Sequence, residues 1–178
     1  MKKHLFTALF LTALPFHTAN AACTITPKGI GGVKLGQTLA QVKRAFPQMK
    51  VRSESDAEGV EMWRLPVAPN AVVYAHVEEG RRGRIDFLET FSAACRTKDG
   101  VHPAMRLTQV AQKWGRLRNI TMSEIEMRQF AQFARQPARI GLRVDGGDFG
   151  TQEADAELPL NTSKASPGAK VLSIQIAR

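Results

Sequence analysis

The sequence predicts an α+β protein in which two tandem helix-plus-antiparallel-meander repeats form one sheet with both helices on one face. Two observations predict this fold class. The apolar face of a short helix recurs 68 residues later, where Leu107, Val110, Lys113 and Trp114 stand at the offsets of Leu39, Val42, Ala45 and Phe46. Strand-like segments separated by turn-forming residues follow each helix. A recurring unit indicates a tandem duplication, and helices over one face of antiparallel strands form an α+β layer.

The first repeat is expected to cover residues 22–95. Thr38 is placed as the N-cap of a helix that runs to Phe46, and Pro47 ends this helix because proline cannot continue it. Four strands are expected after the helix: a weak one near Val51, then 60–65, 72–77 and 85–88.

The second repeat is expected to cover residues 96–178. The same offset places its helix at 106–114 and its strands near Ile120, at 128–133 and at 140–144. The last strand breaks the offset and falls at 171–176, so an inserted, exposed loop is expected at about 146–168. Ser123 to Glu126 resemble the capping box of a helix, but the repeat register makes the following residues a strand, and we follow the register.

The first 21 residues resemble a secretory signal peptide. Lys2 and Lys3 form a positive start, Leu5 to Phe16 form a short apolar run, and Ala19 to Ala21 fit an A-x-A cleavage site. No later stretch approaches the roughly 20 apolar residues of a membrane span. We therefore expect a periplasmic or secreted protein with no membrane span.

Two cysteines follow the signal segment, Cys23 and Cys95. In an exported chain an even cysteine count predicts a disulfide, which would close a long loop and stabilise the fold by roughly 4 kcal/mol. The disulfide has two alternatives. A lipidated Cys23 would need leucine where Asn20 stands in a lipobox, and a redox cysteine normally occurs in a C-x-x-C motif, which this chain lacks.

The segment Gly32–Val42, which precedes and begins the first helix, resembles the repeat of the β-lactamase inhibitory protein family. It also resembles the single unit of the small outer-membrane-assembly lipoproteins of the SmpA/OmlA type. The second repeat departs from this pattern, with Ala104 in place of Gly36 and Arg106 in place of Thr38. The resemblance implies a non-enzymatic scaffold whose sheet face or loops bind another protein, without identifying the target.

Basic residues are unevenly distributed. Without Lys2 and Lys3 the chain has 23 basic and 16 acidic residues. Residues 96–143 hold ten Lys and Arg against three acids, whereas 144–157 hold five acids and no base. In an exported protein, a basic face suggests an acidic partner, such as lipid headgroups, an envelope polyanion or an acidic surface on another envelope protein; the alternative is an ordinary solvated surface. Export, few aromatic residues and no recognition motif argue against nucleic acid.

Five residues are candidates for contacting the partner. Trp63 and Tyr74 are aromatic side chains that could lie on an exposed sheet face, although for Trp63 a core position is the favoured interpretation. Arg116, Arg118 and Arg128 belong to the basic segment, and reversing their charges is expected to weaken binding without unfolding the protein.

No motif predicts catalysis, a metal or a cofactor. His76 and His102 have no metal-ligand spacing, the acids at 145–157 do not match the twelve-residue calcium loop, and no G-x-S-x-G turn is present. Glu61 and Asp86 could pair only if the fold brought them together. The sequence therefore predicts an exported, non-enzymatic protein-binding module, such as an inhibitor, immunity or envelope-assembly factor. The alternatives are a small envelope hydrolase, a carbohydrate- or polyanion-binding protein, or a structural accessory.

Overall fold

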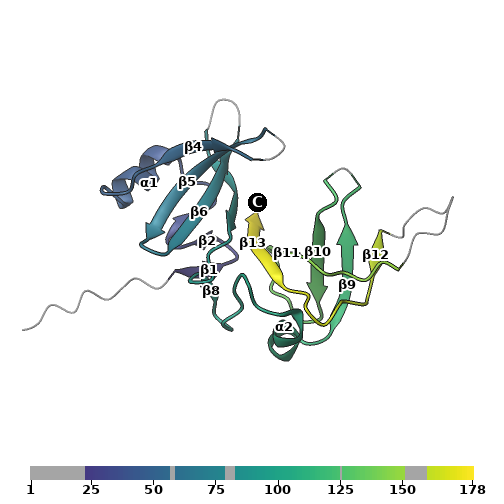
Figure 1. Ribbon diagram of the computed structural model, residues 1–178. Coiled ribbons are helices and arrows are strands. Elements are labelled where there is room, and N and C mark those ends of the chain that lie inside the picture. The colour runs from purple at the N-terminus through teal and green to yellow at the C-terminus, as the bar shows by residue number, and fades with distance from the viewer. Residues whose placement is uncertain (1–22, 57–58, 79–82, 125, 151–159) are drawn as a thin grey trace, which may run out of the picture.

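The computed structural model describes residues 23–56, 59–78, 83–124, 126–150 and 160–178 (Figure 1). The chain is mostly β: these residues hold thirteen strands and two short helices. The strands form two sheets, one of four strands and one of nine. Within the described ranges, no helix has the length and apolar character needed to cross a membrane. The predicted signal segment lies outside the described residues.

The four-stranded sheet is built from very short strands. Its order is β3-β2-β1-β8, and its members are β1 (Thr24–Thr26), β2 (Gly29–Ile30), β3 (Val33–Lys34) and β8 (Arg96–Thr97). Strands β1 and β8 run parallel, with Ile25 opposite Thr97. This pairing joins the start of the chain to the segment that leads into the second helix.

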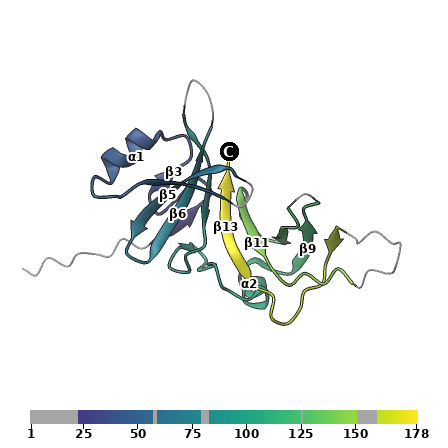
Figure 2. The ribbon, with the colours of Figure 1, turned by 45° about the horizontal axis from the view of Figure 1, so that its top comes forward.

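The nine-stranded sheet is antiparallel throughout. In spatial order its strands are β12 (Asn161–Thr162), β9 (Leu117–Met122), β10 (Gln129–Phe133), β11 (Ile140–Val144), β13 (Val171–Ala177), β7 (Ile85–Thr90), β6 (Ala71–Val77), β5 (Glu61–Ala68) and β4 (Arg52–Ser55). The C-terminal strand β13 lies between the two halves of this sheet (Figure 2). It pairs with β7, where Ile176 stands opposite Leu88.

The two helices begin differently. At the start of α1 (Leu39–Ala45), the Thr38 hydroxyl accepts a hydrogen bond from the backbone N–H of Gln41, whose side chain accepts one from the N–H of Thr38. This is a complete capping box. At the start of α2 (Leu107–Trp114), Gln109 accepts a hydrogen bond from the N–H of Arg106, but the Arg106 side chain makes no capping hydrogen bond, because a guanidinium has no acceptor.

Both helices and the small sheet share one core with the nine-stranded sheet. Buried side chains of the large sheet join those of the small sheet and of both helices in one cluster, including Leu65, Leu88, Leu142, Ile174, Ile25, Val42, Val110 and Trp114. Trp114 is 1% exposed, and its indole N–H donates to Asp99. One face of the nine-stranded sheet is therefore covered. We call the other the open face; it carries Tyr74, Glu89 and Arg143.

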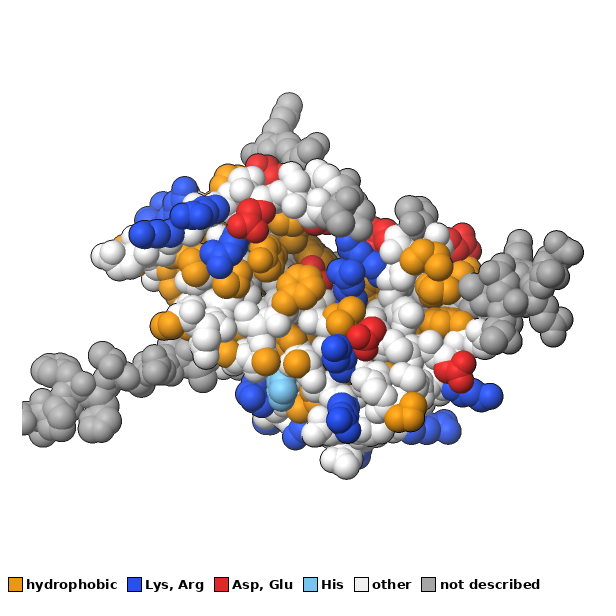
Figure 3. Space-filling view, viewed as in Figure 1, with side chains coloured by type: hydrophobic (Ala, Val, Ile, Leu, Met, Phe, Trp, Pro, Cys, Tyr) orange, Lys and Arg blue, Asp and Glu red, His pale blue; other side chains and the backbone are white. Residues whose placement is uncertain are grey.

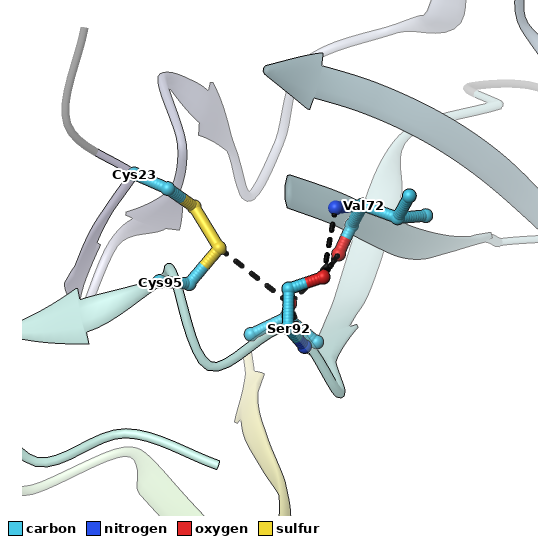
Figure 4. Close-up of a disulfide and its surroundings, with 5 residues drawn as sticks. Cys23, Val72, Ser92 and Cys95 are labelled. Atoms are coloured by element: carbon cyan, nitrogen blue, oxygen red, sulfur yellow. Dashed lines mark hydrogen bonds between the residues drawn. A yellow bond between two sulfur atoms is a disulfide. The ribbon is translucent and has the colours of Figure 1, made fainter. Parts of the chain in front are cut away.

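A disulfide joins Cys23 to Cys95, 72 residues apart, and confirms the predicted pairing. It lies beside the start of β6 (Figure 4). The buried Thr90 hydroxyl is within 3.6 Å of the Cys95 sulfur and donates to the carbonyl oxygen of Val72. The backbone N–H of Val72 donates to the hydroxyl of Ser92. The disulfide therefore joins the residues just before β1 and β8 of the small sheet, and the hydrogen bonds of Thr90 and Ser92 hold this region against β6.

The nine-stranded sheet is strongly curved. Asp56 follows β4, Arg128 precedes β10, and these strands are six positions apart in the sheet. In a flat sheet, strands with that separation would be about 29 Å apart. The Arg128 guanidinium nevertheless reaches the Asp56 carboxylate at 4.0 Å. The open face is therefore concave, with the β4–β5 and β9–β10 turns meeting across it.

The predicted fold class is wrong. The chain forms a mostly β protein with two sheets, and not one sheet built from two helix-plus-meander repeats. Sequence periodicity missed the small sheet because β2, β3 and β8 have two residues each, too few for an alternation to be recognised. The two expected helices and the longer strands do overlap the observed elements. The segment after Ser123–Glu126 is strand β10, and residues 161–162 of the expected loop form β12.

Candidate functional site

The open face contains a cavity of about 790 Å³, which we call the open-face cavity. In Figure 3, hydrophobic side chains gather around a hollow in the middle of the molecule, with basic and acidic side chains at its border. Its lining residues come from both halves of the nine-stranded sheet: Glu54, Ser55, Asp56, Val60, Met62, Tyr74, His76, Phe87, Glu89, Phe91, Glu126, Arg128 and Arg143.

Strand alternation explains why these side chains meet. Successive side chains of a strand point to opposite faces. In β6, Val73 and Ala75 are fully buried in the core, so Tyr74 and His76 point to the open face. Tyr74 pairs with Glu89 of β7, which continues the same face.

One wall of the cavity is apolar. Phe91, just after β7, is 48% exposed, and its ring meets the edge of the Tyr74 ring with centroids 5.9 Å apart. Val60 is 42% exposed beside the buried Met62. Met127, between the lining residues Glu126 and Arg128, is 58% exposed. These are the large hydrophobic side chains most exposed in the described chain, and they lie at or beside the cavity.

Glu89 lies at the bottom of the cavity and is 8% exposed. Its carboxylate accepts hydrogen bonds from the hydroxyl of Ser173 and, at 3.1 Å, from the side-chain amide of Gln175, both on β13. A buried carboxylate needs such donors to offset its lost hydration. Glu89 therefore joins β7 to β13 at the junction of the two halves.

His76 and Asp86 form a second polar pair. The register of β6 and β7 shifts between His76 and Val77, which leaves Asp86 beside the imidazole. The Nδ1 atom and a carboxylate oxygen are 2.7 Å apart, and both side chains are about one-third exposed. This contact orients the ring, and among the described residues its Nε2 atom has no hydrogen-bond partner.

Ion pairs occupy most of the charges at the border of the cavity. Arg64 faces Glu54 at 3.7 Å, and Arg128 faces Glu126 at 3.1 Å as well as Asp56. Arg143 differs from these groups. It projects from β11 between the buried Leu142 and Val144, and no side chain in the described part of the protein bonds to its guanidinium.

The structure brings together two of the five residues that the sequence singled out. Tyr74 and Arg128 both line the open-face cavity. Trp63 pairs with Ala75 and packs against the core on the covered face. Arg116 and Arg118, before and within β9, are exposed and do not line this cavity. Arg128 is itself paired with two carboxylates, which reduces its value as a free basic contact.

Sequence reasoning missed Phe91, Glu89 and Arg143. The alternation of side chains along a strand could have indicated Phe91. Phe91 directly follows the buried Thr90, just as Tyr74 directly follows the buried Val73, so both are expected on the open face. Nothing local marks Arg143, which resembles its nine basic neighbours in residues 96–143. That Arg143 lacks a carboxylate partner follows from the strand order of the folded sheet, in which its neighbours on β10 and β13 are Phe130 and Ser173.

The remaining candidates form no evident reaction centre. Glu61 accepts a hydrogen bond from Ser53, whereas Asp86 pairs with His76, so the fold does not pair the two acids. His102 bonds the carbonyl oxygen of Pro103. Within the described ranges no three His, Cys, Asp or Glu side chains are grouped to hold a metal ion. The acidic segment is described only in part, since residues 151–159 lie outside the described chain.

The fold has a solved counterpart. No family model matches the chain, and no curated protein matches it. Among solved structures, the chain is similar to the crystal structure of the uncharacterized protein yfeY from Escherichia coli, with a TM-score of 0.54 and 15% sequence identity. The match covers 88% of this chain and 99% of that chain. At this identity the similarity concerns the fold alone.

Proposed function

We propose that this protein is an exported, non-enzymatic binding protein that holds a segment of another protein in its open-face cavity. The observation that carries the proposal is the exposure of Phe91, Val60 and Met127 at or beside one concave surface. Exposed apolar side chains grouped in this way are typical of sites that contact another molecule. Aromatic anchors such as Tyr74 and Phe91 commonly supply much of the binding free energy at protein interfaces.

Export is part of the proposal. The first 21 residues have the pattern of a signal peptide, and the Cys23–Cys95 disulfide is compatible with an oxidising compartment outside the cytoplasm. An inhibitor, an immunity protein or an envelope-assembly factor that acts on an envelope protein is compatible with such a location.

Affinity capture with matched variants tests the proposal. Tagged protein comprising residues 22–178 is incubated with native envelope extract and washed at low and high salt. We expect a stoichiometric partner that survives high salt, because apolar contacts are not screened. Phe91→Ala should weaken its binding about 30-fold, corresponding to about 2 kcal/mol at an aromatic anchor. The double variant Arg116→Glu/Arg118→Glu, outside the cavity, serves as the control and should retain the partner.

Two results would count against this function. If Phe91→Ala captures the partner as well as the unaltered protein while Arg116→Glu/Arg118→Glu loses it, binding occurs on the basic surface instead. If only glycans or lipids are captured and salt releases them, the polyanion-binding alternative replaces the proposed one.

A further inference from the structure

The charges that line the open-face cavity are unequally satisfied. Each of its four carboxylates has a partner described above: Glu54, Asp56 and Glu126 face arginines, and Glu89 accepts hydrogen bonds from β13. Arg128 is held by two of these carboxylates. Arg143 alone among the charged lining residues has no ion pair or hydrogen bond within the described chain. Arg143 is therefore the charged lining residue that has no partner of its own, although the lining as a whole holds four carboxylates against two arginines.

The position of Arg143 makes this charge significant. Its strand is fourth in the order of nine, so it lies well inside the sheet, and the side chain is partly buried. Its register neighbours on the open face are Phe130 and Ser173, neither of which carries charge. A partly desolvated guanidinium with no counter-ion is unfavourable compared with one paired to a carboxylate. An anionic group from outside would supply that partner.

The opposite wall indicates what else the ligand carries. Among described residues, the Tyr74 hydroxyl and the Nε2 atom of His76 have no hydrogen-bond partner, and both line the same cavity as Arg143. Beside them lie the rings of Phe87 and Phe91. A ligand that fits this arrangement has a carboxylate next to a bulky apolar group. Arginine suits a carboxylate because its planar fork can form two parallel hydrogen bonds.

We infer that the open-face cavity binds an acidic segment of the partner protein, in which an Asp or Glu carboxylate pairs with Arg143 and a neighbouring apolar side chain packs on Phe91 and Tyr74. This inference rests on the proposed function. A polypeptide fits better than a small molecule because Val60 and Met127 extend the exposed apolar surface to the border of the cavity. A segment of chain that continues beyond the cavity would cover them as well.

A displayed library of random peptides tests this inference without a known partner. Peptides are selected on the protein comprising residues 22–178, and the selected set should be enriched in Asp or Glu next to an aromatic or branched apolar residue. One selected peptide is then measured by fluorescence polarisation in two forms, with its acid intact or changed to the matching amide. Arg143→Gln and the amide peptide should each weaken binding about 10- to 100-fold, and together hardly more than either alone.

Controls separate the possible failures. Arg118→Gln removes an exposed arginine elsewhere and should leave the affinity unchanged, and Arg143→Gln should melt within a few degrees of the unaltered protein.

Selected peptides that lack acids, or that bind Arg143→Gln as tightly as the unaltered protein, would overturn the inference. They would leave the proposed function intact if Phe91→Ala still weakened binding about 30-fold. A selection that yields no peptide sensitive to Phe91→Ala would contradict the proposed function itself. Equally tight binding of 3-phenylpropionate would overturn the assignment to a polypeptide.

Discussion

Strands β4–β7 present Met62, Tyr74 and Phe87 to the open-face cavity, whereas β11 on the other side borders it with Arg143, and Ser173 and Gln175 of β13 donate to the lining residue Glu89. The first half therefore supplies the apolar lining side chains and three of the four carboxylates, whereas the second half supplies both arginines. Binding surfaces need both, since apolar area contributes affinity and polar groups fix orientation. Neither half alone therefore forms the site, which exists only because β7 pairs with β13.

The two halves also differ in how they are stabilised. The first half has the disulfide, the four-stranded sheet and a helix with a complete capping box. The second has a helix without a side-chain cap and a long connection between β11 and β13 that carries the two-residue strand β12. Because both halves share one core, global unfolding should be cooperative. Local stability should nevertheless differ between the halves, because their local supports differ.

Removing the disulfide should have the largest effect. Replacing Cys23 and Cys95 by alanine releases a loop of 72 residues and should lower the free energy of unfolding by about 4 kcal/mol, measured by chemical denaturation. Hydrogen exchange should show the loss of protection concentrated in β1–β3 and β8. Equal loss in β9–β11 would show that the bond does not act on the first half. In the unaltered, denatured protein a thiol titration should find no free thiol.

Core truncation tests whether the halves unfold together. Leu65 in β5 and Leu142 in β11 are both fully buried. Leu65→Ala and Leu142→Ala should each destabilise the protein by about 3 kcal/mol, because each leaves a cavity in a packed core. Since β13 pairs with β7, both variants should still show one denaturation transition by fluorescence and by circular dichroism. Two separated transitions in either variant would show that the halves are independent.

The helix starts provide a smaller, matched comparison. Thr38→Ala removes a capping hydroxyl and should destabilise the protein by about 1 kcal/mol. Arg106→Ala removes a side chain that makes no capping hydrogen bond and should change stability by less than about 0.5 kcal/mol. Thermal denaturation of the two variants side by side is sufficient. An equal loss would mean that Arg106 supports α2 in a way other than capping.

The ion pairs at the border of the cavity should matter least for stability. Glu126→Gln removes one carboxylate from Arg128, and because the Glu126 side chain is 35% exposed the loss should stay below about 1 kcal/mol. The difference from the unaltered protein should shrink further in 1 M salt, because exposed charges are screened. A loss of several kcal/mol would indicate that contact between the two turns holds the sheet in its curved form.

Local elements of this fold follow from sequence, whereas their assembly does not. The spacing of Leu39 and Val42 and the cap at Thr38 predict α1, and alternation around Tyr74 predicts β6 and its open-face side chain. Cysteine count predicts the disulfide. Three strands of the four-stranded sheet have only two residues each, too few to show an alternation of apolar and polar side chains. The predicted single sheet was therefore wrong.

The site was less predictable than the elements. Its two walls come together through the curvature that brings Arg128 to Asp56, and curvature depends on contacts between residues far apart in the chain. The isolation of Arg143 likewise depends on which strands neighbour β11. A charge count over residues 96–143 treats this arginine and the exposed Arg118 alike, although only one of them lies in the cavity.

Photo-crosslinking in the native host tests most directly whether the junction of the two halves is the binding surface. The photoreactive amino acid p-benzoylphenylalanine replaces Tyr74 inside the cavity or, as the control, Arg118 outside it. We predict a covalent adduct with one envelope protein from position 74 upon irradiation, and none from position 118. An adduct from position 118 with none from position 74 would contradict the account and move the binding surface to the basic edge of the second half.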